Sequence, residues 1–234
     1  MARTALDRYS PFRVRQQPAN TRRYNEEQKV DLKITDIQAG DVLLCYSSMT
    51  AEEETAGRTG YSHIAIALAE ERVLEASNQG VQIVPVGKLL EDYDHIAVLR
   101  ELKPNELWDE ARLKSLEEFA DQAKDKRFNQ TGLGRFPSRK ESYKNNLMER
   151  VHGYFEGTAQ KIPSNRSIYF CSELVTAAII HVGIIEQSAA VVFTPETFSP
   201  SDIATDKAFG YFCGYVKSTP SYLVPDGDFF KSNI

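Results

Sequence analysis

Four short apolar segments follow one another closely in the first half of the chain, and their spacing constrains the fold more than any other feature. They cover residues 42–46, 61–68, 72–86 (interrupted around 78–80) and 95–101. Short apolar runs bounded by turn residues are typical of strands. The connections between them are too short to hold crossover helices, so we expect these strands to pair in an antiparallel sheet.

Beyond residue 104 the apolar residues recur every three or four positions, which predicts helices. We expect helices over residues 107–123 with Asn105 as the N-cap, over 141–155 and over 171–182, together with a loop at 126–139 and a last strand at 210–216. Strands followed by helices and a final strand predict one α+β domain. This domain spans residues 36–217, between a basic N-terminal arm (1–35) and a C-terminal extension (218–234).

Charge and hydropathy exclude several classes of protein. The chain has 28 basic and 33 acidic side chains and a net charge of −5, which disfavours a nucleic-acid binder. Its apolar runs fall far short of the roughly 20 residues of a membrane-spanning helix. The first 23 residues hold six arginines and one acid but no apolar core of a secretory signal, so we expect synthesis in the cytoplasm without a signal peptide.

Three cysteines, Cys45, Cys171 and Cys213, are too few and of the wrong parity for a disulfide framework. Cys171 stands where an irregular segment becomes a predicted helix. Unpaired N–H groups and the helix dipole favour negative charge at such a position, so Cys171 is a candidate thiolate nucleophile. The same amides can hold an oxyanion. We expect Cys45 and Cys213 to fill the core from strands.

A thiolate nucleophile needs a base, and His63 is the best placed of the four histidines. His181 lies ten residues after the candidate nucleophile on the same helix, about 15 Å away, and His152 belongs to a polar helix surface. Strand alternation puts His63 on one face with Ala65 and Ala67. We expect these small side chains to leave room for the helix that carries the thiol.

A third residue should orient the imidazole, and two residues compete for that role. Glu75 is an acid inside an otherwise apolar strand, where a carboxylate requires a partner. It shares a face with His63 if a three-residue turn around Ala69 or Glu70 sets the register, whereas a two-residue turn at positions 70–71 places it on the opposite face. His95, on the next strand, is the alternative.

Four strings of residues together resemble a known family. They are Gly40–Leu44 (GDVLL), Tyr61–Ile66 (YSHIAI), Val73–Ala76 (VLEA) and Tyr169–Val175 (YFCSELV), with weaker echoes in Arg127–Asn129 and Thr194–Glu196. They are similar to the circularly permuted NlpC-type papain-like cysteine peptidase and amidase superfamily, in its YiiX-like branch, where the histidine strand precedes the cysteine helix. The resemblance covers residues 36–217 and implies a papain-like fold with Cys171 as nucleophile, His63 as base and Glu75 as the orienting residue.

The resemblance also implies a function, a thiol hydrolase that cleaves an amide bond in peptidoglycan peptides. A wall hydrolase without a signal peptide would need a signal-independent route to a periplasm or target cell, which would make it an antibacterial effector toxin with a delivery or immunity partner. Two alternatives stay open: a lipid acyl hydrolase or acyltransferase of the lecithin–retinol acyltransferase type, and an inactive binding module. We expect residues 138–167 to shape the substrate groove.

Cofactors and other partners are not expected. The sequence has no His, Cys and Asp cluster with metal-ligand spacing and no phosphate-cradling glycine motif. The interpretation therefore includes no metal, no cofactor, no nucleic acid and no stable membrane insertion.

Overall fold

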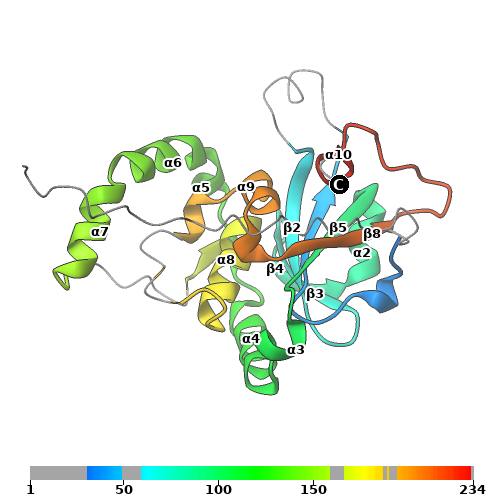
Figure 1. Cartoon of the computed structure of the whole chain (residues 1–234), viewed down its shortest axis with the longest axis horizontal. Coiled ribbons are helices and arrows are strands. Elements are labelled where there is room, and N and C mark those ends of the chain that lie inside the picture. The colour runs from blue at the N-terminus through cyan, green and yellow to red at the C-terminus, as the bar shows by residue number, and fades with distance from the viewer. Residues whose placement is uncertain (1–30, 49–58, 159–165, 187–188, 190–193, 233–234) are drawn as a thin grey trace, which may run out of the picture.

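A six-stranded antiparallel sheet lies at the centre of the molecule, surrounded by helices (Figure 1). The computed structural model describes residues 31–48, 59–158, 166–186, 189 and 194–232. The predicted α+β class and the antiparallel pairing are confirmed in these residues. The strands, in the sheet order β4-β3-β2-β1-β5-β8, are β1 Val42–Tyr46, β2 Tyr61–Ala67, β3 Arg72–Ser77, β4 Gly80–Pro85, β5 His95–Arg100 and β8 Tyr211–Lys217, and β6 Arg127–Phe128 pairs separately and in parallel with β7 Ile168–Tyr169.

Helices cover both faces of this sheet, with α4 and α8 on one side and α2 on the other (Figure 1). The α-helices are α2 Val86–Asp92, α3 Pro104–Leu107, α4 Glu110–Ala123, α5 Gln130–Gly134, α6 Phe136–Asn145, α7 Leu147–Phe155, α8 Cys171–His181, α9 Pro200–Thr205 and α10 Phe229–Ser232. In the described part of the chain, 3-10 turns lie at η1 Ile34–Asp36, η3 Pro195–Thr197 and η4 Lys207–Phe209. The sheet is therefore the middle of three layers.

Each face of the sheet packs into its own apolar core. The larger core sets Ile64, Ile66 and Leu74 against α8 and α4. The smaller core holds Ala65 and Ala67 together with residues of α2. The expectation that these alanines make room for the cysteine helix is therefore wrong. They make room for α2, whereas the wide apolar surface of α8 packs against the branched side chains of the opposite face.

Two predicted elements are each divided in the structure. The expected third strand is a hairpin of β3 and β4, in which Ser77 pairs with Gly80 across the turn. The helix expected from Asn105 is a single turn, α3, followed by the longer α4. The N-cap of α4 is Asp109, whose carboxylate accepts the N–H of Arg112 at 2.9 Å. A proline at the start of α3 and an aspartate two residues past its end both signal helix starts, so two short helices replace one.

The region predicted as a loop, 126–139, is also more structured than expected. It contains β6, α5 and the first turn of α6. Asn129 caps α5 by accepting the N–H of Gly132 at 2.8 Å, and this local bond offsets the low helix propensity of two glycines. The helix expected at 141–155 breaks at Asn146 into α6 and α7.

Segments on both sides of the predicted domain limits contact the sheet. The N–H of Leu32 donates to the carbonyl of Tyr215 at 2.7 Å. At the other end, the buried carboxylate of Asp228 accepts the hydroxyl of Tyr61 at 2.8 Å and faces His95 at 3.3 Å. The C-terminal segment is thereby fastened to β2 and β5. Residues 1–30 of the predicted N-terminal arm lie outside the described residues.

Candidate active site

Cys171 is the first residue of α8, as the sequence predicted. Phe170 before it is extended, and the first helical bond runs from the N–H of Leu174 to the carbonyl of Phe170 at 3.0 Å. The amides of residues 171–173 precede that bond and belong to the group that a helix leaves unpaired. These donors and the helix dipole give the thiol a site that favours a negative charge.

His63 and Glu75 form a buried pair at the same place. The Nε2 atom of His63 lies 2.7 Å from Oε2 of Glu75, and the two residues are 7% and 8% exposed. The imidazole also stacks on the ring of Tyr93, with centroids 5.4 Å apart and planes within 3°. Carboxylate and tyrosine together fix the ring, so Nδ1 is the nitrogen left to face another group.

Glu75 shares a face of the sheet with His63 because a three-residue turn joins β2 and β3, which is one of the two turns that the sequence allowed. The N–H of Leu68 donates to the carbonyl of Arg72 at 2.8 Å, which encloses residues 69–71 in the turn. Ala65 consequently pairs with Glu75, and Glu75 shares a face with His63. This conditional prediction is confirmed. Both central glutamates of the turn, at positions 70 and 71, have positive φ, of 59° and 54°.

The electrostatics of His63 connect it to Cys171. Burial disfavours the charged imidazolium, but hydrogen bonding to Cys171 and to Glu75 outweighs that effect and raises the pKa of His63 from 6.5 to about 9. The ring is therefore protonated at neutral pH, with the carboxylate on one side and the sulfur on the other. Such an arrangement places a charged imidazole beside the candidate nucleophile.

A fork in the sheet explains how Cys171 and His63 meet although α8 packs on the opposite face. β2 and β3 pair only from Ala65–Glu75 to Ala67–Val73 and separate beyond those residues. A pocket of about 220 Å³ lies at the separated ends, and both Cys171 and His63 line it. The thiol thus reaches the imidazole at the point where the two strands part.

The pocket at the fork is lined by aromatic side chains together with serines and an asparagine. Its aromatic lining residues are Tyr93, Phe128, Phe136, Phe170 and Phe198. A larger hollow of about 770 Å³ adjoins it and shares Ser62, Leu133, Phe136, Ser199 and Pro200 with it. Serines and the charged residues of α6 and α9 line this second hollow, namely Ser47, Ser48, Ser201, Lys140, Glu141, Lys144 and Asp202. Together the two hollows form a groove with aromatic side chains at its catalytic end and a polar outer end that holds the charged side chains.

Glu173 supports the start of α8, and sequence reasoning assigned it no role. It is fully buried, and its carboxylate accepts the N–H of Phe170 at 3.2 Å, the amide of Asn129 at 3.1 Å and the guanidinium of Arg166 at 2.7 Å. Arg166 also pairs with Glu196 at 2.9 Å. Asn129 and Glu196, which belong to the two segments with a weaker family resemblance, therefore join one hydrogen-bond and ion-pair network at the start of the helix that carries Cys171. An acid in the first turn of an apolar helix was the signal that could have revealed it.

Gly132 illustrates how tightly this network is packed. A Cβ atom at this position would lie 2.2 Å from Nδ2 of Asn129, the atom that donates to Glu173. Only glycine leaves the asparagine in place. Ser172, next to the thiol, is held in turn by a 2.6 Å bond from its hydroxyl to the carbonyl of Phe198.

The other candidate residues lie elsewhere. His95 is fully buried and bonds to Asp228 at 3.3 Å and to the hydroxyl of Tyr222 at 3.1 Å, so it is not the residue that orients His63. His152 is exposed beside Glu156, as predicted for a surface residue. Cys45 is fully buried, and burial raises its pKa, in agreement with a core position.

One cysteine prediction is wrong. Cys213 lies on β8 but is exposed, because β8 is the edge strand of the sheet. Within the described ranges, no group of three or more His, Cys, Asp or Glu side chains could hold a metal ion. None of the helices in those ranges has the length and apolar character needed to cross a membrane.

An α+β fold in which a helix-start thiol and a histidine line one pocket, with a buried glutamate bonded to the histidine, defines a candidate thiol hydrolase. Among curated proteins the chain is similar to "Probable lipoprotein peptidase YaeF" of Escherichia coli (strain K12), with 28% identity over 176 residues, which is 68% of this chain. The chain spans 61% of that relative's length. No family model matches, and no solved structure matches. The similarity supports a peptidase-like protein.

Proposed function

We propose that the protein is a cysteine hydrolase that cleaves an amide bond, with Cys171 as nucleophile, His63 as base and Glu75 as the residue that orients His63. The observation that carries the proposal is the position of His63, held by Glu75 at 2.7 Å and interacting with Cys171 in one pocket. An inactive binding module would be expected to have the histidine out of reach of the thiol, so this arrangement favours an enzyme.

The chemistry follows from these positions. The Cys171 thiolate attacks the carbonyl carbon of the amide, and the first amides of α8 stabilise the oxyanion. The C–N bond then breaks as the His63 imidazolium gives its proton to the leaving amine. A water molecule, deprotonated by His63, attacks the thioester and breaks the C–S bond. The acid product leaves, and the proton on His63 restores the ion pair.

Peptidoglycan peptides are the substrates we propose first. The similarity to a probable peptidase and the resemblance to permuted NlpC-type enzymes support this class. The order of the elements also fits the permuted arrangement, since the histidine strand β2 precedes the cysteine helix α8. The polar outer end of the groove, formed in part by residues 140–144 of the segment expected to shape it, suits a peptide chain with charged groups.

The direct test is mass spectrometry of purified wall fragments incubated with the protein. We expect cleaved peptides with the wild type and none with Cys171→Ala. The matched control is Cys213→Ala, which removes an exposed thiol outside the site and should leave cleavage unchanged. Equal cleavage by wild type and Cys171→Ala would refute the proposal.

Lipid acyl transfer is the second candidate, because four phenylalanines contribute to the lining of the catalytic end of the groove. Phe128, Phe136, Phe170 and Phe198 surround the thiol and would suit an acyl chain. Incubation with phospholipid vesicles followed by assay of free fatty acid separates the two candidates. Fatty acid released by the wild type but not by Cys171→Ala, without cleavage of wall fragments, would favour the lipid reaction.

The proposed toxin role concerns delivery rather than chemistry. It follows from the proposed wall substrate and from residues 1–23, which have no apolar core of a secretory signal; residues 1–30 lie outside the described residues. Expression of the chain with an added export signal should reduce the viability of a bacterial host, and the Cys171→Ala variant should not. Unchanged viability with the exported wild-type chain would count against this role.

A further inference from the structure

Helix α7 exposes an apolar stripe that the proposed catalysis does not use. Met148 and Phe155 are 77% and 81% exposed, and Leu147 and Tyr154 are 37% and 42% exposed. Together with Val151, these side chains recur at the spacing that places them on one face of a helix. Four of the eight large apolar side chains that are exposed in the described residues therefore fall within nine positions.

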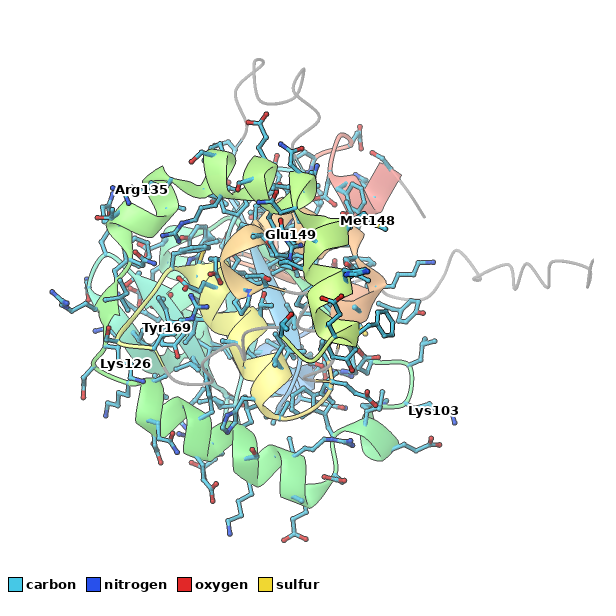
Figure 2. All side chains as sticks on the ribbon, turned by 90° about the vertical axis from the view of Figure 1, so that its left-hand side faces the viewer. Lys103, Lys126, Arg135, Met148, Glu149 and Tyr169 are labelled. Carbon is cyan, nitrogen blue, oxygen red and sulfur yellow. The ribbon has the colours of Figure 1, made fainter. Side chains whose placement is uncertain are left out.

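This stripe lies at one end of the molecule. Figure 1 shows α7 at the left, beyond α6 and away from the sheet. No residue of α6 or α7 is buried. In Figure 2, which views the molecule from that side, Arg135 lies near the start of α6 and Met148 near the start of α7. A projecting apolar helix can contact an apolar environment outside the protein without any rearrangement of the protein core.

Basic side chains accompany the stripe although the chain as a whole is acidic. Residues 135–155 hold five basic and two acidic side chains, whereas the whole chain has a net charge of −5. Some of these cations have partners within the protein, since Lys140 pairs with Asp202 and Arg150 stacks on Tyr143. Arg135 and Lys144 are exposed. The local charge complements an anionic surface.

We propose that residues 135–155 dock the protein onto an anionic lipid surface, with Met148 and Phe155 entering the boundary between headgroups and acyl chains. Short amphipathic helices with basic flanks bind in the interfacial plane in this way. Self-association is the weaker reading, because a stable dimer buries about 1,200–2,000 Å², more than a helix of nine residues offers.

Docking would also place the groove at the lipid surface. Lys140, Glu141 and Lys144 of α6 line its polar outer end, and α7 follows α6 after a single residue. A substrate held at the membrane would then meet the groove without leaving it. The docking proposal does not rest on the proposed chemistry, since it concerns binding alone.

The test is co-sedimentation of the full chain with vesicles of phosphatidylglycerol and phosphatidylcholine, compared with pure phosphatidylcholine vesicles. We expect the protein to pellet with the anionic vesicles and to be released by 0.5 M salt, roughly the range in which exposed charges are screened. The double variant Met148→Ser/Phe155→Ser should bind the anionic vesicles at least about tenfold more weakly than the wild type, because two large apolar side chains no longer enter the lipid.

The matched control is Leu223→Ser, which removes an equally exposed apolar side chain, 82% exposed, from the C-terminal segment. It should bind like the wild type. Cys171→Ala should also bind like the wild type, which separates docking from catalysis. Circular dichroism checks that each variant folds, and a polarity-sensitive dye on Met148→Cys, in a Cys171→Ala/Cys213→Ser background, should shift to the blue on anionic vesicles.

Three results would overturn the proposal. The wild type could fail to pellet with anionic vesicles. The double variant could bind as tightly as the wild type. Light scattering could show a dimer that the double variant dissociates, which would assign the stripe to self-association instead.

Discussion

Replacement of Glu75 by Gln tests the central claim, that this carboxylate sets the charge of His63. The pKa of His63 lies about 9 against an ordinary value of 6.5, a difference worth about 3 kcal/mol in favour of the imidazolium. Hydrogen bonding to Cys171 and to Glu75 shares that amount. If Glu75 supplies about half, its loss removes roughly 1.5 kcal/mol, or about a factor of ten in the equilibrium between the imidazolium and the neutral imidazole of His63.

Two measurements follow the change without knowledge of the substrate. NMR titration of the His63 ring should show its pKa falling from about 9 toward the ordinary value in Glu75→Gln. Alkylation of Cys171 by iodoacetamide should slow in the variant as His63 loses its charge, because the thiolate is the reactive form and the neighbouring imidazolium stabilises it. A Cys213→Ser background removes the exposed thiol, and Cys45 is buried.

The control is Glu156→Gln, which alters the exposed His152–Glu156 pair instead of the buried one. It should change neither the titration of His63 nor the alkylation of Cys171. An unchanged pKa for His63 in Glu75→Gln would refute the assignment of Glu75 as the orienting residue. An unchanged alkylation rate together with a lowered pKa would refute the link between His63 and the thiolate.

Three further predictions concern pH and stability. The folding stability contributed by His63, whose pKa is raised from 6.5 to about 9, should be fully present below pH 6.5 and be lost as the pH rises through about 9; urea unfolding measured across that range checks this. Glu173→Ala should lower the free energy of unfolding in urea by about 3 kcal/mol, because Arg166 and the N–H of Phe170 lose a buried partner. Asp228→Ala should lower it by about 2 kcal/mol by calorimetry, because the hydroxyl of Tyr61 is left without its acceptor.

Local sequence patterns were sufficient to predict the elements that carry the site. The apolar runs at 42–46 and 61–68 became β1 and β2, and the stripe from Cys171 became α8. The alternation of side chains along a strand also reduced the position of Glu75 to a choice between two turns. These predictions succeeded because each depends on residues that are neighbours in the chain.

Long-range packing decided what the sequence could not. Periodicity showed that α8 has an apolar surface but not which face of the sheet it covers, and the small side chains of Ala65 and Ala67 pointed to the wrong face. The fork between β2 and β3 depends on where their pairing stops after Ala65 and Glu75, which no local pattern marks. The thiol and the imidazole both line the pocket at this fork. They meet there although the sequence predicted the wrong face of the sheet for α8.

Glu75 and Glu173 show why a buried acid in an apolar segment identifies a site without identifying its role. Both interrupt apolar runs, and both are less than a tenth exposed, so each requires a partner. The partner of Glu75 is a titratable ring that faces a pocket, whereas those of Glu173 include an arginine and a backbone amide that stay donors at all moderate pH values. Substitution of Glu75 should therefore lower the pKa of His63, whereas substitution of Glu173 should lower stability and leave that pKa unchanged.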